Sequence, residues 1–348
     1  MDKKIRMGVV GCGGFGCQHI LNLNNNERAE VVALCDTNTE LLDRVADYFK
    51  MDKKYTDIDD MLRTEDIDAV VVATNDQHHR EMTVKALRAG KHVLCEKPMA
   101  LTVEDCKEMI KAEKESGKKL MIGQICRMTP GFAEAKKMID KGVIGELFYV
   151  ESEYAHDYSS FTDASSWRAD PLRHIVIGGG CHAIDLLRWM AGDPYETTCY
   201  SNKKMLKSLP TDDCAIAIFR FPNDVIGKVF ISSGCKRAYT MRTSLYGTKG
   251  TIVVNNTDPF MTVYRERIVE GEKILDGVYE KEQENDIALR YPININNHNV
   301  EGEHKDFLDA IINDTPVATD GREGMATVAV CRAVIESADK HKTVEIKY

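Results

Sequence analysis

Short runs of apolar residues alternate with longer amphipathic stretches through the first third of the chain. The apolar runs predict strands. The run at residues 70–73 is continuously apolar, which is typical of a parallel sheet covered on both faces. The alternation of strands with helices predicts a doubly wound α/β domain over residues 1–125. The predicted strands are 5–10, 30–35, 68–74, 92–95 and 119–124, and the predicted helices are 16–24, 39–49, 80–89 and 103–116.

The pattern changes after residue 125 to alternating apolar and polar positions. Such period-2 runs predict a mainly antiparallel, open sheet with one face on helices and the other free to meet another subunit. Turns at 222–224 and 247–250 separate the strands. Residues 126–348 are therefore predicted to form a second, α+β domain, in which 293–299 is an ordered loop. The predicted strands are 146–154, 214–221, 227–233, 242–246 and 251–255, with helices at 181–190, 303–313 and 323–338.

Composition narrows the class of protein. A length of 348 residues suggests two domains, and 43% hydrophobic with 29% charged residues fits a globular chain. A net charge of −9 without a basic run argues against nucleic acid or an anionic membrane surface as a partner. The chain enters a strand at once and has no long apolar run, so neither a signal sequence nor a membrane span is expected. The 11 cysteines are scattered without a C-x-x-C pair, which favours free thiols in the cytoplasm.

A glycine-rich turn follows the first predicted strand. Gly11, Gly13 and Gly16 form G-x-G-x-x-G, with Gly14 and Phe15 between the last two. Such glycines permit a tight turn, backbone approach to a pyrophosphate and close packing of helix on strand, and the helix N-terminus binds the diphosphate. Asp36 ends the second strand 20 residues after Gly16, where a carboxylate would accept hydrogen bonds from an adenosine ribose. The alternative is a glycine turn without a ligand.

Two further groups of residues follow predicted parallel strands, and ligands of doubly wound sheets bind at the carboxyl ends of strands. Thr74, Asn75 and His78 could line the cofactor site, although a helix cap is an equally good explanation. Glu96 and Lys97, followed by a proline, come directly after the strand at 92–95. Lys97 would then point towards the cofactor, and its alternative role is that of a surface lysine in a turn.

The second predicted domain contains candidates for substrate chemistry. His182 opens a helix after three glycines, with Asp185 near the same face, and histidine is a natural proton acceptor near neutral pH. A packed core histidine is the alternative. Trp167 offers an aromatic surface to a sugar and Arg168 a donor to hydroxyls, or else the pair is a core anchor and a surface ion-pair partner. No metal is predicted, because His298, Glu301 and His304 lack a recognised zinc spacing.

The glycine turn, Asp36, Glu96-Lys97-Pro98 and the segment 179–189 together resemble the glucose–fructose oxidoreductase/inositol dehydrogenase family over nearly the whole chain. The resemblance implies an N-terminal Rossmann domain that binds NAD and a C-terminal domain whose open sheet forms dimers or tetramers. It also implies a sugar, cyclitol or related diol as substrate. Lys97 would be the active-site lysine and His182 the catalytic histidine, and Arg127 would begin the second domain at the substrate site.

Two positions depart from the family pattern. Inositol dehydrogenases place an aspartate four residues before the histidine, where this chain has Gly178, and many relatives have proline in place of Asn75. A lysine–aspartate–histidine triad is therefore not supported. Trp167, Arg168 or Asp185 would have to orient the substrate instead.

The chain is interpreted as an NAD-dependent dehydrogenase of a sugar, cyclitol or related glycoside. In this hypothesis His182 accepts the hydroxyl proton and Lys97 stabilises the developing alkoxide. Asp36 favours NAD over NADP because a carboxylate repels a 2′-phosphate. The first alternative is a glycosidase or lyase that recycles its NAD through a transient 3-keto sugar. The second is an NAD-binding regulator without catalysis.

Overall fold

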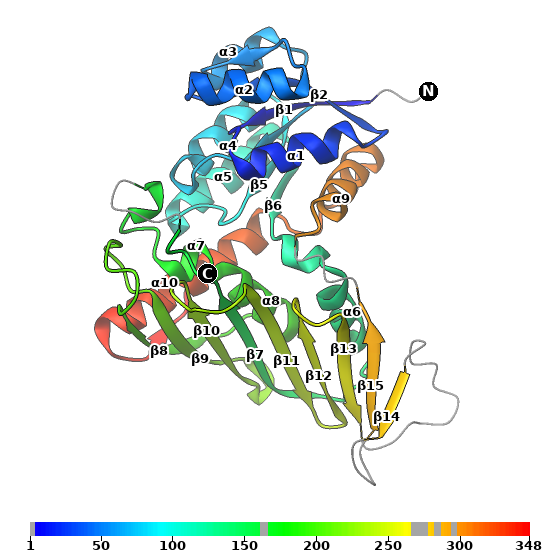
Figure 1. The fold of residues 1–348 in the computed structure, drawn as a ribbon, viewed down its shortest axis with the longest axis vertical. Helices are drawn as coiled ribbons and strands as arrows, with labels where there is room; N and C mark the ends of the chain where they lie inside the picture. The colour runs from blue at the N-terminus through cyan, green and yellow to red at the C-terminus, as the bar shows by residue number, and fades with distance from the viewer. Residues whose placement is uncertain (1–3, 161–165, 266–277, 282–286, 294–297) are drawn as a thin grey trace. The chain divides into compact units, whose positions relative to one another are not determined.

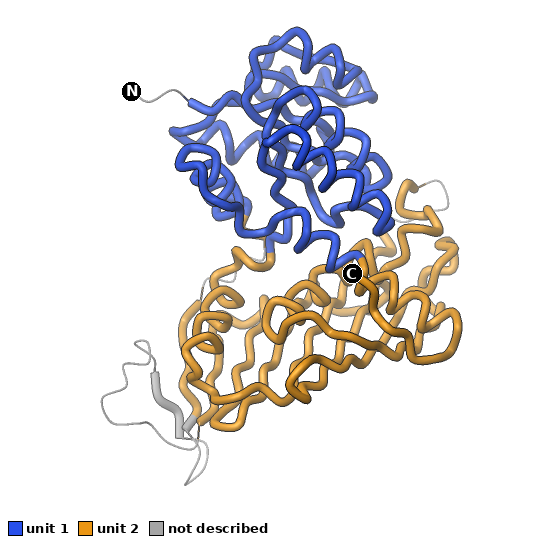
Figure 2. The backbone as a smooth tube through the Cα atoms, turned by 180° about the vertical axis from the view of Figure 1, so that it is seen from behind, with its two compact units in different colours: residues 1–125, 300–328 blue, residues 126–299, 329–348 orange. Residues whose placement is uncertain are grey.

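The computed structural model describes residues 4–160, 166–265, 278–281, 287–293 and 298–348. The chain forms two compact units (Figures 1 and 2). The first contains Met1–Ile125 and Val300–Val328, and the second contains Cys126–Asn299 and Ala329–Tyr348.

The first unit is built on a six-stranded parallel sheet with the order β3-β2-β1-β4-β5-β6. Its central strands are fully buried because helices cover them, which explains their continuous apolar runs. The strands are β1 (Ile5–Val10), β2 (Ala29–Cys35), β3 (Lys54–Tyr55), β4 (Ala69–Val72), β5 (His92–Glu96) and β6 (Leu120–Gly123). The helices are α1 (Gly14–Asn24), α2 (Thr39–Phe49), α3 (Ile58–Thr64), α4 (His79–Arg88), α5 (Val103–Ser116) and α9 (Val300–Asn313).

Local sequence signals set the ends of these helices. The Thr102 side chain accepts a hydrogen bond from the Asp105 backbone N–H and so caps the start of α5. Gly117 ends the same helix in the left-handed conformation at φ 65°, which glycine adopts without strain. The Asn38 side chain caps α2 in the same way. These caps explain why the predicted bounds of α2 and α5 match the structure.

The second unit contains a ten-stranded sheet with the order β14-β15-β13-β12-β11-β7-β10-β9-β8-β16. All neighbours are antiparallel except β7 and β10, which are parallel. Helix α8 (Cys181–Ala191) contacts the central strands β7, β10 and β11, while α6 (Pro130–Asp140) contacts β12. The short α7 (Ile175–Gly178) precedes α8, and α10 (Gly321–Lys340) contributes residues to both units. The strands are β7 (Leu147–Ala155), β8 (Glu196–Asn202), β9 (Cys214–Arg220), β10 (Ile226–Ser232), β11 (Thr240–Gly247), β12 (Gly250–Asn255), β13 (Phe260–Arg265), β14 (Val278–Lys281), β15 (Ile287–Pro292) and β16 (Val344–Glu345).

The predicted fold class, a parallel doubly wound sheet followed by a mainly antiparallel open sheet, is confirmed. The structure adds elements that the pattern did not indicate, including α3, α6 and the strands β8 and β13 to β16. Residues 300–328, expected in the second domain, belong to the first unit, where α9 contacts α1. Most of the predicted loop at 293–299 lies outside the described residues, since only 293, 298 and 299 are described.

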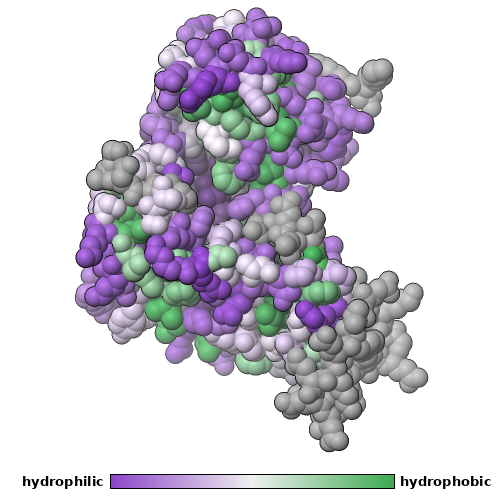
Figure 3. All heavy atoms as spheres, viewed as in Figure 1, coloured by the Kyte–Doolittle hydropathy of each residue, from purple (hydrophilic) through white to green (hydrophobic). Residues whose placement is uncertain are grey.

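The cysteines, the helices and the hydrophobic surface residues are arranged as expected for a globular chain. The 11 cysteines are all unpaired, and each is buried or half-buried. In the described part of the chain, no helix is long and apolar enough to cross a membrane. On the face shown in Figure 3, hydrophobic residues lie in small groups between hydrophilic ones.

Candidate active site

The glycine turn between β1 and α1 leaves no room for a larger residue at Gly11 or Gly16. A Cβ at Gly16 would collide with the carbonyl oxygen of Gly11, and one at Gly11 would collide with that of Ala73. Gly11 also has φ +94°, which disfavours any other residue. Gly13 is the N-cap of α1 without a side-chain cap, and no atom lies within 4 Å of a Cβ placed at Gly13 or Gly14. The first N–H groups of α1 therefore suit an anion such as a diphosphate.

Asp36 stabilises this turn from the end of β2. Its Oδ2 accepts a hydrogen bond of 2.7 Å from the Cys12 backbone N–H, and its Oδ1 accepts one of 2.8 Å from the Asn38 N–H. A carboxylate has about four acceptor sites, so it can also accept ribose hydroxyls. Asp36 thus has a role that the spacing did not predict, since it links β2 to the glycine turn.

A cavity of ≈ 560 Å³ opens beside the turn in the first unit. Three charged side chains that the sequence reasoning missed also line it, namely Asp57, Glu81 and Lys85. Lys85 is bridged to Glu81 at 3.2 Å and to Asp59 at 2.9 Å, so nearby carboxylates offset its charge. The turn and this cavity fit an adenine dinucleotide, with the ribose hydroxyls at the acidic end. The predicted cofactor residues that line the cavity are Gly11, Gly13, Asp36, Thr74, Asn75 and His78.

The predicted Lys97 follows β5 and is half-buried. The backbone around it is held from two sides. The Lys97 N–H donates to Glu96 Oε2 at 3.2 Å, and His79 lies with Nδ1 2.8 Å from the Pro98 carbonyl and Nε2 3.2 Å from the Thr74 carbonyl. Two carbonyl acceptors require both ring nitrogens of His79 to carry protons. Burial lowers the pKa of His79, but Cys95, Asp76 and the Pro98 carbonyl raise it to about 9.

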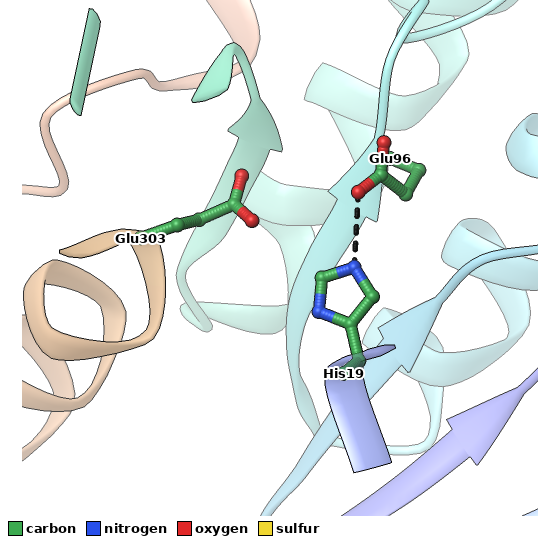
Figure 4. A group of neighbouring side chains, drawn as sticks. All are labelled: His19, Glu96 and Glu303. Carbon is green, nitrogen blue, oxygen red and sulfur yellow. Dashed lines mark hydrogen bonds and ion pairs between the residues drawn. The ribbon is translucent and has the colours of Figure 1, made fainter. Parts of the chain in front are cut away.

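Glu96 does not line the cavity, although it is predicted to bind the cofactor. It is buried in a polar cluster with His19 from α1 and Glu303 from α9 (Figure 4), and the cluster also includes His304 from α9, which lies against His19. His19 Nε2 lies 2.9 Å from Glu96 Oε1, and His19 Nδ1 lies 2.8 Å from His304 Nε2. Burial raises the pKa of Glu96, yet the hydrogen bond from His19 and the charges of His19 and Lys97 outweigh it and leave the pKa lowered.

Glu303 is the unusual member of this cluster. It is fully buried, and neither carboxylate oxygen has a hydrogen-bond partner among the described residues. Burial and the nearby Glu96 raise the pKa of Glu303 well above its usual range, so it is held as a neutral acid. Burial and His19 lower the pKa of His304, which is therefore a neutral imidazole. Glu96 is thus ionised, while Glu303 and His304 are neutral.

The cluster also has the donor atoms of a possible metal site, since ligand atoms of His19, Glu96 and Glu303 lie within 4.8 Å of one another. The hydrogen bond between His19 and Glu96 uses the atoms that a metal would need. The three residues that resemble metal ligands in the sequence, His298, Glu301 and His304, do not form a common cluster in either unit. His304 bonds to His19, His298 stacks on Tyr239 in the second unit at 5.9 Å, and Glu301 is exposed.

His182 lies at the start of α8 and is 4% exposed. Its Nδ1 lies 3.3 Å from Cys126 Sγ, and its ring stacks on Tyr154 with centroids 6.1 Å apart. The His298 ring packs edge-on against the His182 ring, with the two centroids 5.9 Å apart. Tyr154, Cys126 and His298 come from separate parts of the chain, so their proximity to His182 could not be predicted from spacing. Tyr158 adds a hydrogen bond of 2.6 Å to the Tyr154 hydroxyl.

Asp185 and Arg127 bind each other. Arg127 donates from Nε to Oδ2 at 2.9 Å and from Nη2 to Oδ1 at 2.7 Å, and both residues are buried. Arg188 lies 3.9 Å from the same carboxylate, and the Arg127 guanidinium lies over Trp189 at 5.7 Å. The pair therefore fixes α8, which carries His182, against the segment that begins at Cys126. The prediction that Arg127 and Asp185 contact substrate stays a prediction.

Trp167 and Arg168 form a short 3-10 turn and are half-buried. The Arg168 guanidinium lies 4.2 Å from the indole centroid, and that of Arg173 lies 4.5 Å from it. Arg173 also fills the space beside Gly178, where a Cβ would lie 2.6 Å from its Nη1. The absence of an aspartate at Gly178 is visible in the sequence, but the position of Arg173 in that space is visible only in the structure.

Known proteins share this architecture. Residues 5–124 match the model of an oxidoreductase family with an NAD-binding Rossmann fold, and residues 136–346 match its C-terminal alpha/beta domain. Inositol 2-dehydrogenase of Salmonella typhimurium is 28% identical over 252 residues, which cover 71% of this chain and 72% of that protein. Inositol 2-dehydrogenase 2 of Saccharopolyspora erythraea is 30% identical over 264 residues, covering 75% and 76%.

A solved structure of levoglucosan dehydrogenase in complex with NADH has a TM-score of 0.86 at 24% identity and covers 99% of this chain and 100% of that one. This likeness shows the shared fold. The two family models together span most of the chain, and the first describes the domain in which the glycine turn, Asp36 and the cavity lie. The chain belongs to the glucose–fructose oxidoreductase/inositol dehydrogenase (Gfo/Idh/MocA) family and is an NAD-dependent oxidoreductase.

Proposed function

We propose that this oxidoreductase oxidises a secondary hydroxyl of a sugar, a cyclitol or a related glycoside. The observation that carries the proposal is the environment of His182, a buried histidine whose Nδ1 is held by Cys126 and whose ring is packed on Tyr154. In this proposal the Nδ1–H donates to the Cys126 sulfur, which leaves the lone pair on Nε2. The relatives named above are dehydrogenases of cyclitols and of an anhydrosugar, which supports this substrate class.

In this proposal the bound NAD supplies the hydride acceptor. His182 accepts the hydroxyl proton on Nε2, and Lys97 donates a hydrogen bond to the oxygen as negative charge develops on it. Cys126 and Tyr154 hold the imidazole in one orientation. Glu96 and His79 hold the turn that carries Lys97.

The test is a substrate screen followed by two substitutions. Sugars, cyclitols and glycosides are incubated with NAD, and NADH formation is followed by absorbance. With the best substrate, we expect Lys97→Ala and His182→Ala each to lose at least about 100-fold in kcat. Lys111→Ala and His341→Ala, at exposed positions, are matched controls that should retain activity. Near-full activity of both active-site variants would refute the assignment. Glycoside cleavage without net NADH formation would indicate recycling of NAD instead.

The same proposal includes a homodimer or homotetramer formed through the open sheet. Ile216 and Ile218 on β9, Ile226 on β10 and Tyr200 on β8 point away from the helices and are between 43% and 72% exposed. An exposed apolar patch of this kind marks an interaction surface. We expect Ile218→Glu to shift the elution volume in size-exclusion chromatography towards the monomer. Because all 11 cysteines are unpaired, the proposal also places the enzyme in the reducing cytoplasm.

A further inference from the structure

Two charged side chains of one ion-pair network, Glu81 and Lys85, line the cavity that also contains Asp36. They are four residues apart on α4 and so lie on one face of that helix, where Glu81 Oε1 is 3.2 Å from Lys85 Nζ. Asp59, in the first turn of α3, brings a second carboxylate oxygen to 2.9 Å from the same nitrogen. The Lys85 ammonium is therefore held between carboxylates from two different helices.

The cap of α3 fixes the position of Asp59. The Asp57 side chain accepts hydrogen bonds from the backbone N–H groups of Asp59 at 2.8 Å and of Asp60 at 3.2 Å, and α3 then packs against α4. Asp57 also lines the cavity. Both carboxylates that bind Lys85 thus belong to helices, so the network is part of the rigid wall of the cavity.

This network lies close to the end of β2, where Asp36 would accept the ribose hydroxyls of the cofactor. Burial and the charges of Asp36 and Asp57 raise the pKa of the Cys35 thiol to about 12, while the charge of Lys85 lowers it. A thiol senses a charge in this way only at short range. Because Cys35 directly precedes Asp36 in the chain, the Lys85 ammonium lies within electrostatic range of the ribose site.

We propose that Glu81 and Asp59 are specificity residues for the cofactor, because they bind the Lys85 ammonium and so withhold it from the 2′-phosphate of NADP. In proteins of this fold that bind NADP, a nearby basic residue accommodates that phosphate. Lys85 has the charge for this role, and a lysine ammonium binds phosphate well. Its two carboxylate partners offset that charge and also repel the phosphate, in addition to the repulsion from Asp36. The inference concerns the cofactor and does not depend on the substrate proposed above.

Binding titrations by calorimetry, without substrate, test the inference. The Kd of NAD and the Kd of NADP are measured for the wild type, Glu81→Gln, Asp59→Asn and the double variant. We expect each single substitution to lower the ratio of the NADP Kd to the NAD Kd by about fivefold, and the double variant to lower it by about 30-fold, at low ionic strength. The Kd of NAD should change less than about twofold. Both carboxylates are about half exposed, so about 0.5 M salt should reduce the 30-fold gain to less than about fivefold.

Removing the lysine separates its role from simple repulsion. Lys85→Gln added to the double variant should leave less than about fivefold of the 30-fold gain, because no ammonium is then available to bind the phosphate. Lys85→Gln alone should not lower the ratio, since its carboxylate partners remain. Glu115→Gln is the matched control. It removes a carboxylate that pairs with Lys111 on α5, and neither residue lines the cavity, so both Kd values should stay unchanged.

Each outcome decides a separate point. A 30-fold gain that persists after Lys85→Gln would overturn the role of Lys85, because the carboxylates would then act by repulsion alone. An unchanged ratio in a double variant that still binds NAD would overturn the inference as a whole. If the double variant does not fold in thermal unfolding, the single variants decide, since each must lower the ratio. Failure of every carbohydrate to form NADH would refute the proposed function and leave these titrations unaffected.

Discussion

Replacing Glu303 by glutamine should stabilise the folded chain, and increasingly so at higher pH. Glu303 is fully buried without a hydrogen-bond partner among the described residues, and its carboxylate lies within 4.8 Å of the ligand atoms of Glu96 and His19. Two carboxylate charges at that distance repel each other by about 3.5 kcal/mol with an effective dielectric constant of about 20. The folded chain avoids this repulsion because Glu303 retains its proton.

The sign of the pH dependence follows from the raised pKa. The unfolded chain releases the Glu303 proton near pH 4.5, while the folded chain keeps it to a much higher pH. The contribution of the Glu303 proton to the free energy of unfolding is therefore fully present below about pH 4.5. It is lost as pH rises towards the folded pKa, by up to 1.36 kcal/mol per pH unit. Glutamine has no proton to hold, and its amide can donate to Glu96. We expect Glu303→Gln to raise the free energy of unfolding by about 2 kcal/mol at pH 8 and to have little effect at pH 5.

Urea unfolding followed by circular dichroism between pH 5 and pH 8 measures this difference. Glu301→Gln, two residues earlier on α9 and exposed, is the matched control and should not change the pH dependence. The reasoning is refuted if Glu303→Gln destabilises the chain at every pH, as expected when a carboxylate is bound by a donor or a metal. A loss of wild-type stability in the presence of a chelator would identify the metal.

Three further predictions concern other described contacts. Asp36→Asn should reduce the preference for NAD over NADP by about 100-fold in a binding titration, because one charge at about 5 Å from a 2′-phosphate costs about 3 kcal/mol with an effective dielectric constant of about 20. The free energy of unfolding of the wild type should fall between pH 6.5 and about 9, because the raised pKa makes the protonated form of His79 the stabilising one. In His79→Gln this fall should be absent. Asp185→Asn should cost about 3–5 kcal/mol in urea unfolding because it removes the carboxylate charge that binds the buried Arg127 guanidinium, and Arg127→Met in the same chain should restore part of it.

The parallel half of the fold could be predicted from sequence because its buried strands are continuous apolar runs. Its glycine turn and Asp36 are recognisable because their roles depend on spacing within one short segment. The second half was predicted less completely, since short edge strands such as β16 have too few residues to show an alternation. The predicted residues that line the cavity are those that follow a strand directly or lie in the glycine turn. Asp57 and Lys85 were missed because they reach the cavity from helices and turns.

Contacts between distant segments could not be predicted at all. His19 and His304 are 285 residues apart, and nothing near either histidine indicates the other. Gly178 and Arg173 are only five residues apart, yet their contact could not be predicted. The sequence showed only that position 178 has no aspartate. Which side chain fills that space depends on how α7 packs, and packing of this kind is not encoded in periodicity.

The turn that carries Lys97 shows how residues without any proposed contact to substrate can control a reaction. A lysine side chain has four rotatable bonds, so its precision depends on the backbone that carries it. Glu96 accepts the Lys97 N–H on one side, and His79 donates to the Pro98 carbonyl on the other. Both groups are charged and buried. His19 and Lys97 favour the charged form of Glu96, and Cys95, Asp76 and the Pro98 carbonyl favour the charged form of His79. A change at His19 should therefore lower kcat without touching the substrate, because it would release the Glu96 carboxylate that holds the lysine in place.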